Sequence, residues 1–445
     1  MRSVKVLVAV VVVALLGATA AFAATAFEDV PQGAFYDEPT AWAVEQGLTV
    51  GCDRAAGQAV SDTFCPLANV SRGENITFTY RHQTLVIDPL LEEIRGDVAA
   101  ADVPDRVVWV ADDGTGDFTS LSAALESITD ASVSNPYVVR IAPGTYTETS
   151  TVELKAYVDV EGSGEGVTTI TCACATAGDG APDASTATVL AGDIVAEIRH
   201  LTIENTGGDN YSTGIWTENV VDGSVSMLHV TATATGDGAG YGVRNDSSSP
   251  SMTNVTATGT STSDSGFGVY NASSSPSMMN VTATGAATVF KGYGVFNRSS
   301  SSPMMTNVIA TGTSTSDEGF GVFNASSSPS MMNVTATGST NSASRGLGVY
   351  NELSSSPSMM NVTASGNSAS GPSFGVYNKS SSSSIRASVL SGFSSLYNDA
   401  GSSAEVAATM LDGAVDGTGD FTCVGAYDET FVELDTDCTV VITPP

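Results

Sequence analysis

Two stretches, Gly240-Tyr-Gly-Val-Arg-Asn245 and Gly266-Phe-Gly-Val-Tyr-Asn271, open a repeat that decides the fold of this chain. Similar copies end at Asn297, Asn324, Asn351 and Asn378, so the copies lie 26, 26, 27, 27 and 27 residues apart. A second motif, Pro250-Ser-Met-Thr-Asn-Val255, recurs with nearly the same period. Such a period indicates a supersecondary unit that stacks on copies of itself, which is a solenoid.

The residue types of the repeat (Val, Tyr, Phe, Thr, Gly, Ser and Asn) favour strands joined by tight turns over helices. Met278 and Val281 are apolar in nearly every copy, yet an unbroken strand would point residues three apart to opposite faces. A left-handed bend at Asn280 would bring both side chains to one face. The pattern therefore predicts a mainly β protein, a parallel β-helix with three strands per coil of about 26 residues. The general preference of parallel crossovers makes it right-handed.

Changes in residue composition along the rest of the chain indicate its domain boundaries. Arg2 and Lys5 precede an apolar run that ends in small residues, which is typical of a secretory signal peptide. Leu121, Ala124 and Leu125 fall at helical spacing and predict a helix that covers the open end of the β-helix. The expected divisions are a signal peptide (1–23), a small N-terminal domain (27–85), a linker (86–105), a strand and capping helix (106–136), the β-helix (137–393) and a C-terminal cap (394–445).

The charge of the chain restricts its partners. With 48 acidic and 16 basic residues the formal net charge is −32, which argues against nucleic acid and anionic membranes as partners. No aspartate run has calcium-loop spacing, and we expect no metal site, no cofactor and no membrane insertion after the signal peptide is cleaved. The oligomeric state does not follow from the sequence.

The six cysteines of an exported chain predict disulfides rather than metal ligands. The expected local pairs are Cys52 with Cys65 and Cys423 with Cys438. Cys172 and Cys174 lie two residues apart on a predicted strand, and three alternatives stay open for them: a bond to each other, free thiols, or a ladder across coils.

The N-terminal domain carries a series of short motifs in a characteristic order. Phe27-Glu-Asp-Val-Pro31 is followed by Trp42-Ala43, by Gly47-Leu-Thr-Val-Gly51 and by Ser71-Arg-Gly-Glu74. This order resembles an S-layer homology module, although Ser71 and Gly73 replace the Thr and Ala of that family's last motif and the chain has a single copy. The resemblance implies a small α-helical domain that binds cell-wall glycan.

In S-layer homology modules the matching motif residues lie at the glycan-binding grooves, and the resemblance places these roles on Asp29, Trp42 and Arg72. The alternative is structural, with Trp42 in the core of the module and Arg72 paired with an acidic side chain at a helix start.

The region that follows also has a recognisable pattern. Asp113-Gly-Thr-Gly-Asp-Phe118, Pro143-Gly-Thr-Tyr-Thr-Glu148 and Gly162-Ser-Gly164 precede Thr168-Thr-Ile170. This opening resembles that of the pectin methylesterases, which implies the cap and first coils of a pectin lyase-like β-helix. The catalytic aspartate motifs of that family are missing, and glutamine, which supplies its oxyanion hole, occurs at position 83 for the last time. We therefore predict no catalytic residues.

Two rows of side chains are candidate binding surfaces. An aromatic row on successive first strands would stack on sugar rings, or would merely stabilise neighbouring strands: Tyr270, Phe296, Phe323, Tyr350 and Tyr377. Thr-x-Thr ranks such as Thr282/Thr284 resemble those of β-helical ice-binding proteins. His200 and His229 occupy the bend position of earlier coils and are interpreted as turn residues.

The sequence as a whole predicts an exported cell-surface β-helix, structural or carbohydrate-contacting, attached to the cell envelope through its N-terminal domain. Its expected partner is a cell-wall polymer or another glycan. Two alternatives remain: a pectinesterase-like or polysaccharide-lyase-like enzyme, and binding to ice or another crystal surface.

Overall fold

The structure, a computed structural model, describes residues 106–175, 182–208, 210–220 and 224–439, together with Ala43. The chain divides into two compact units, Met1–Val103 and Pro104–Pro445, and the architecture given below is that of the second. Several predictions fall outside the described residues: the signal peptide, the S-layer-homology-like module with Asp29, Trp42 and Arg72, and the pair Cys52 and Cys65.

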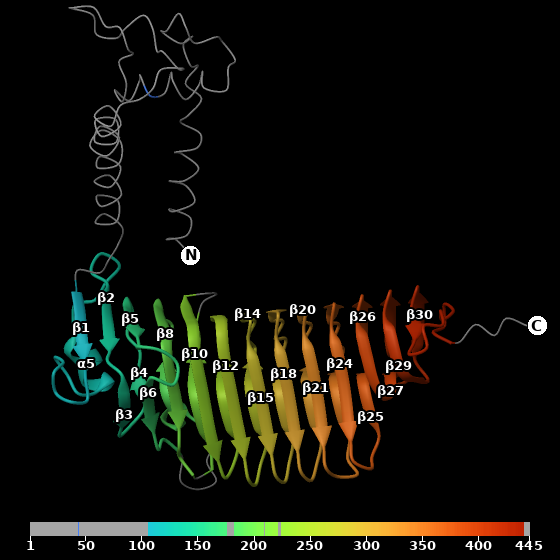
Figure 1. The fold of residues 1–445 in the computed structure, drawn as a ribbon, viewed down its shortest axis with the longest axis horizontal. Coiled ribbons are helices and arrows are strands. Elements are labelled where there is room, and N and C mark those ends of the chain that lie inside the picture. The colour runs from blue at the N-terminus through green and yellow to red at the C-terminus, as the bar shows by residue number, and fades with distance from the viewer. Residues whose placement is uncertain (1–42, 44–105, 176–181, 209, 221–223, 440–445) are drawn as a thin grey trace, which may run out of the picture. The chain divides into compact units, whose positions relative to one another are not determined.

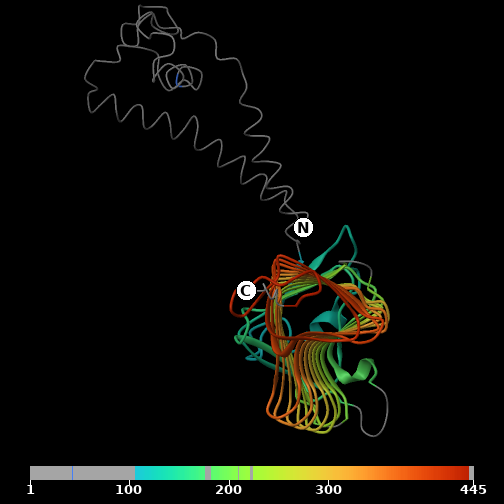
Figure 2. The same ribbon diagram turned by 90° about the vertical axis from the view of Figure 1, so that its right-hand side faces the viewer.

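The second unit is a right-handed parallel β-helix, as the repeat predicts. A typical coil contains β13 (Gly266–Ala272), β14 (Ser277–Met279) and β15 (Thr282–Ala287). Each strand pairs in parallel with its counterpart in the next coil, so the three strands build three sheets along the axis. Figure 2 shows the coils nearly superposed when viewed along the axis. No helix among the described residues is long and apolar enough to cross a membrane.

Three sheets contain all the strands. The first-strand sheet consists of β4 (Val152–Glu153), β7 (Ala187–Ala191), β9 (Ser212–Glu218), β11 (Gly240–Asp246), β13, β16 (Gly292–Arg298), β19 (Gly319–Ala325), β22 (Gly346–Glu352), β25 (Ser373–Lys379) and the end of β27 (Val389–Asn398). The second-strand sheet consists of β1 (Arg106–Val110), β2 (Tyr137–Ile141), β5 (Val158–Glu161), the starts of β8 (Ala196–Asn205), β10 (Val225–Gly236) and β12 (Ser251–Ser261), then β14, β17 (Met304–Thr306), β20 (Ser330–Met332), β23 (Ser358–Met360), β26 (Ser382–Arg386), β28 (Ser403–Ala407) and β30 (Asp420–Val424). The third-strand sheet consists of β3 (Gly144–Glu148), β6 (Thr168–Cys172), the ends of β8, β10 and β12, then β15, β18 (Ile309–Ser314), β21 (Thr335–Thr340), β24 (Thr363–Ser368), the start of β27, β29 (Met410–Gly417) and β31 (Tyr427–Asp428).

The bend between the second and third strands is left-handed, as predicted. Asn280 has φ = 55°, and Met278 and Val281 on either side of it are both buried in the same core cluster. Other bends in this column also have positive φ: His200, His229, Asn254, Asn307, Asn333, Asn361, Ala387 and Ala408. The backbone bend, not a change of residue pattern, therefore directs both apolar side chains inward.

A buried asparagine ladder runs along the ends of the first strands. The side-chain Nδ2 of Asn271 donates to Oδ1 of Asn297 at 2.8 Å, and Asn297 donates to Asn324 at 2.9 Å. The same bond joins the remaining members, from Asn245 through Asn351 and Asn378 to Asn398. Because each amide both donates and accepts, a row of polar groups is buried without loss of hydrogen bonds.

A second asparagine ladder lies on the exposed bends and points the opposite way. Asn280 Nδ2 donates to Oδ1 of Asn254 at 2.9 Å, and Asn307 donates to Asn280 at 3.0 Å. Asn361 and Asn333 continue this outer ladder. Its N-terminal end is His229, whose Nε2 lies 3.2 Å from Nδ2 of Asn254.

Each coil has a wide part around the main core and a narrower extension, which Figure 2 shows end-on. In this extension, glycines allow the backbones of opposite strands to come into close contact. A Cβ at Gly268 would lie 2.4 Å from the backbone N of Thr284, and one at Gly285 would lie 2.0 Å from the carbonyl oxygen of Tyr293. Phe267 and Val269 lie on the same strand but do not share a core. Val269 packs in the main core, whereas Phe267 packs in a separate aromatic cluster. Gly268 lies between them, and the backbone of the opposite strand approaches so closely there that it separates the two clusters.

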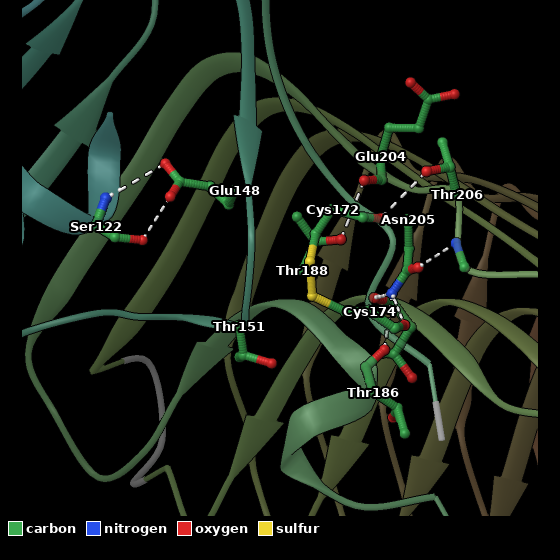
Figure 3. Close-up of a disulfide and its surroundings, with 12 residues drawn as sticks. Ser122, Glu148, Thr151, Cys172, Cys174, Thr186, Thr188, Glu204, Asn205 and Thr206 are labelled. Carbon is green, nitrogen blue, oxygen red and sulfur yellow. Dashed lines mark hydrogen bonds between the residues drawn. A yellow bond between two sulfur atoms is a disulfide. The ribbon is translucent and has the colours of Figure 1, made fainter. Parts of the chain in front are cut away.

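The N-terminal end is closed by helix α5 (Leu121–Ser127). Glu148 Oε1 accepts a hydrogen bond from the backbone N–H of Leu121 at 2.8 Å, and its Oε2 accepts one from Oγ of Ser122 at 2.6 Å (Figure 3). Tyr146 Oη donates to the carbonyl oxygen of Ala142 at 3.0 Å. The Glu of the Pro-Gly-x-Tyr-x-Glu motif therefore holds the capping helix on the first coil, while the Tyr hydroxyl binds the backbone just before its own strand.

Two disulfides are present among the described residues. Cys423 bonds to Cys438 in the C-terminal cap, as predicted. Of the alternatives for the other pair, the structure contains the Cys172–Cys174 bond, shown in Figure 3. Beside it, Asn205 Nδ2 donates to the carbonyl oxygens of Cys174, Thr186 and Thr213, at 2.8, 2.8 and 2.9 Å. This amide ties the disulfide segment, the short 3-10 helix η2 (Ala184–Thr186) and β9 together.

The two ladders predict that replacing a buried asparagine lowers the free energy of unfolding more than replacing an exposed one. Asn297→Ala should lower the free energy of unfolding by about 2 to 4 kcal/mol, because it leaves the amide of Asn271 and the Oδ1 of Asn324 buried without partners. Urea unfolding, with hydrogen exchange to locate the loss, measures the effect.

Asn307→Gly is the matched control, since glycine tolerates the left-handed bend and only exposed hydrogen bonds are lost. Its cost should stay below about 1 kcal/mol. Equal losses of unfolding free energy in the two variants would show that the buried ladder stabilises the fold no more than the exposed one.

Candidate functional site

The aromatic row predicted from the repeat exists. Tyr270, Phe296, Phe323, Tyr350 and Tyr377 are register partners on successive first strands. Their neighbouring ring centroids are 4.9 to 5.3 Å apart. The row lies outside the main core, in the aromatic cluster that also contains Phe267.

The rings of this row are not open to a ligand, which corrects the expectation of an outward sugar-stacking stripe. A second row, with Phe267, Tyr293 and Phe320, packs edge-on against the first. Tyr350 is only 4% exposed, and Tyr270 and Phe323 are also buried, while Phe296 and Tyr377 are partly buried. Each ring is covered by its neighbours along and across the rows, so the geometry fits the alternative of sheet stabilisation.

Charged side chains lie over this aromatic layer. Lys291 Nζ lies 2.9 Å from Oε2 of Glu318, and Arg345 pairs with the other oxygen of that carboxylate. The Arg345 guanidinium also lies 5.6 Å from the ring centroid of Tyr377. Burial opposes its charge, yet the charge of Glu318 and the hydrogen bond between them raise the pKa of Arg345. These departures from the repeat thus neutralise each other and stabilise the coil edge.

A pocket of about 320 Å³ lies at the turns that connect third strands to first strands. Tyr211 and the half-exposed Phe290 supply aromatic surface, Asn210 and Asp264 supply polar groups, and Ser263 and Gly238 complete the lining. Aromatic rings beside amide and carboxylate groups provide both stacking and hydrogen bonding to a hydroxylated ring. The sequence reasoning missed this site because its residues come from turns of four different coils.

A groove of about 380 Å³ runs along the ends of four successive third strands. Its lining is almost entirely small and neutral, with hydroxyl groups such as those of Thr260, Thr262 and Thr313. The Thr-x-Thr ranks share this sheet, where Thr282 aligns with the exposed Ile309 and then with Thr335. The surface offers many weak hydrogen-bonding groups and no strong charge.

A cluster of charged side chains lies on the outer face of the second-strand sheet. Arg199 lies 2.6 Å from Glu197, 3.2 Å from Glu161 and 3.7 Å from Asp159. Arg140 contacts Glu161 from the other side at 3.1 Å. The alternation of Asp159 with Glu161, and of Glu197 with Arg199 one coil later, is the signal that would have revealed the cluster in the sequence.

Two carboxylates in the cluster have opposite pKa shifts. Burial raises the pKa of Asp159 and outweighs the hydrogen bond from the backbone N–H of Glu197. Burial also opposes the charge of Glu161, but hydrogen bonds and attraction from Arg199 and Arg140 lower its pKa. A carboxyl with a raised pKa can act as a general acid, and a neighbouring carboxyl with a lowered pKa can act as a general base. Among the described residues no group of three or more His, Cys, Asp or Glu side chains is arranged to hold a metal ion.

Comparison with known proteins connects the first coils with one family. The model of the Pectinesterase family matches residues 107–239. Probable pectinesterase 49 of Arabidopsis thaliana is 35% identical over 130 residues, which are 29% of this chain and 33% of that protein. This chain thus covers about a third of the relative's length. The residues that the family model matches contain the capping helix and the charge cluster, and they end just before the repeat that opens at Gly240.

Solved structures with related shapes have low identity. Pectin methylesterase from carrot is 13% identical with a TM-score of 0.33, over 71% of this chain and 88% of that one. The A-module of mannuronan C-5 epimerase AlgE6 from Azotobacter vinelandii is 13% identical with a TM-score of 0.40, over 69% and 93%. Pectate lyase Pel9A is 12% identical with a TM-score of 0.38, over 78% and 89%.

The opposite pKa shifts predict opposite effects of two conservative substitutions. Glu161 stabilises the fold above its unfolded pKa of about 4.3, and this contribution is lost as pH falls through its lowered folded pKa. Asp159 contributes below about pH 3.9, and this contribution is lost as pH rises through its raised folded pKa. At pH 7, Glu161→Gln should therefore lower the urea concentration at the unfolding midpoint, and Asp159→Asn should raise it.

Both differences should shrink as the pH of the measurement is lowered, because each carboxyl is protonated once the pH falls below its folded pKa. Shifts of the same sign at pH 7 would contradict the assignment of the two groups.

Proposed function

We propose that this protein is an exported, cell-surface β-helix that serves as a structural, carbohydrate-contacting element of the cell envelope. The observation that carries the proposal is the aromatic and polar pocket of Tyr211, Phe290, Asn210 and Asp264 at the rim of an otherwise uniform rod. The pocket combines two ring surfaces with groups that exchange hydrogen bonds with hydroxyls, which suits a sugar unit of a neutral glycan.

Three further observations support a polysaccharide partner. The matching family and the Arabidopsis relative are named for pectin, a polysaccharide. The hydroxyl-lined groove of Thr260, Thr262 and Thr313 lies along the same coil edges and offers contacts to a polymer that extends past the pocket. The net charge of −32 disfavours polyanionic chains and favours neutral ones.

Attachment is assigned to the N-terminal region. The resemblance of residues 27–85 to an S-layer homology module supports wall binding through Asp29, Trp42 and Arg72, and the pattern of residues 1–23 supports export. In this arrangement the module holds the protein at the envelope, and the β-helix presents a regular surface with a sugar-binding rim.

Co-sedimentation with purified cell-wall polymer tests the proposal. The full chain should pellet, and Tyr211→Ala with Phe290→Ala should weaken pelleting about tenfold or more, since each lost stacking partner costs roughly 1 kcal/mol. Phe393→Ala, which removes an exposed ring outside the pocket, is the matched control and should pellet normally. Equal pelleting of the pocket variant and the control would remove the pocket from the proposal.

A chain that lacks residues 27–85 is the second arm of the same experiment. The shortened chain should pellet more weakly than the full chain, and the binding that remains should depend on Tyr211 and Phe290 of the pocket. If the shortened chain pellets as well as the full one, the attachment role of the N-terminal region is wrong.

The charge cluster favours one alternative function, a pectinesterase-like enzyme. Asp159, Glu161 and Glu197 surround Arg199 within the segment that matches the Pectinesterase model. An ester hydrolase also needs donors for the oxyanion, and no glutamine follows Gln83 in the sequence. The cluster thus offers acid and base groups without the family's oxyanion donors.

Methanol release from methylated pectin decides between the two functions. We expect no release above that of the Glu197→Gln variant, in which the carboxylate nearest to Arg199 is neutral. Release by the unaltered chain that disappears in Glu197→Gln would establish the enzymatic alternative.

A further inference from the structure

Two histidines stand at adjacent coils at the N-terminal end of the outer asparagine ladder. His200 and His229 stand at successive bends, between the register pairs Arg199 with Leu228 and Leu201 with Val230. Their imidazole rings are stacked, with centroids 5.2 Å apart and planes inclined by 14°. The only other histidine of the chain is His82. The two bends before Asn254 thus carry the same residue type at neighbouring positions, whereas the departures after Asn361 are alanines, Ala387 and Ala408.

The outer ladder fixes the orientation of His229. Oδ1 of Asn254 already accepts a hydrogen bond from Nδ2 of Asn280 at 2.9 Å, so Nδ2 of Asn254 faces the ring, 3.2 Å from Nε2 of His229. An amide nitrogen only donates, so this Nε2 accepts and carries a lone pair. An imidazole nitrogen with a lone pair is the form that binds a metal ion.

The other side of the pair is uncovered by side chains of the preceding coil. Gly162 follows the register pair Glu161 with Arg199, so it stands opposite His200. A Cβ at Gly162 would lie 2.4 Å from the carbonyl oxygen of His200, and glycine places no side chain against the imidazole. His200 is partly exposed and His229 is exposed, so a dissolved ion can reach both rings from solvent.

The electrostatic surroundings attract a cation. Immediately beside the pair, Asp159, Glu161 and Glu197 surround Arg199, and Arg140 is the second guanidinium of the cluster. Three carboxylates against two guanidinium groups leave one negative charge. The whole chain, at −32, adds a field of the same sign.

We propose that His200 and His229 form a two-imidazole surface site for a borderline divalent transition-metal ion, with Cu²⁺ bound more tightly than Ni²⁺ or Zn²⁺. Imidazole suits these ions, and the order follows their general affinities. With centroids 5.2 Å apart, rotation of the side chains brings one nitrogen of each ring to about 2.0–2.1 Å from a shared ion. Water completes the coordination, since the described residues hold no larger ligand group.

Titration of the full-length chain with Cu²⁺ in excess Mg²⁺ tests the site, because Mg²⁺ occupies carboxylates and leaves imidazoles free. We expect one equivalent of Cu²⁺ with an electron paramagnetic resonance spectrum of two coordinated nitrogens. His200→Asn and His229→Asn should each weaken binding about tenfold or more, because the second imidazole acts as an intramolecular ligand. Asparagine is the residue that later coils carry at this bend, so both variants should fold.

Two further variants make the test specific. Asn254→His adds a third ring to the column and should tighten Cu²⁺ binding, whereas His82→Asn should leave it unchanged. The proposal is overturned if the double variant His200→Asn/His229→Asn binds Cu²⁺ as tightly as the unaltered chain. Coordination by oxygen alone in the spectrum would also overturn it.

Discussion

The buried asparagine ladder is the constraint on which the rest of the structure depends. An amide inside an apolar core needs a donor and an acceptor at fixed distances, and here both are the same amide in the coils before and after, as Asn271, Asn297 and Asn324 show. This requirement forces successive coils to superpose, with strands in register and a spacing of ~4.8 Å. A coil that deviates at this position would leave two neighbours unsatisfied, so the ladder couples local sequence identity to the stability of the whole stack.

Superposition of coils restricts where function can arise. Side chains that repeat in every coil form rows, and a row gives cumulative weak contacts rather than a single reactive centre. The chemically distinctive groups therefore lie where the ladder is absent or does not restrict the residue type. These places are the first coils, with the cluster around Arg199, the bend column, where His200 and His229 replace asparagine, and the rim turns, with Tyr211 and Phe290.

Sequence reasoning succeeded where one local property determines the outcome. The three-residue spacing of Met278 and Val281 can be reconciled with one core only by a bend, and Asn280 has the left-handed φ that this requires. It failed where the outcome depends on contacts between distant coils. The row of Tyr270 has the predicted register, but its burial follows from the position of Phe267, which in turn follows from the close approach at Gly268. The rim pocket likewise combines residues from turns of different coils, and no alternation within one coil reveals it. The charge cluster, by contrast, leaves a signal within single strands, the alternation of Asp159 with Glu161 and of Glu197 with Arg199.

Variation in coil length shows which parts of the repeat are free to change. The coil with the Ser299–Ser302 turn has one residue more than the coil with Ser273–Ser275, and the longer turn has two residues of positive φ, Ser299 and Ser300, where the shorter has one, Ser273. The flanking strands keep their length and register. Insertions are thus absorbed by turns, while the strands that carry the ladder are conserved in geometry. A binding pocket assembled from turns, such as the one at Phe290, changes its shape without cost to the core, which makes the rim the part of the rod best suited to specific recognition.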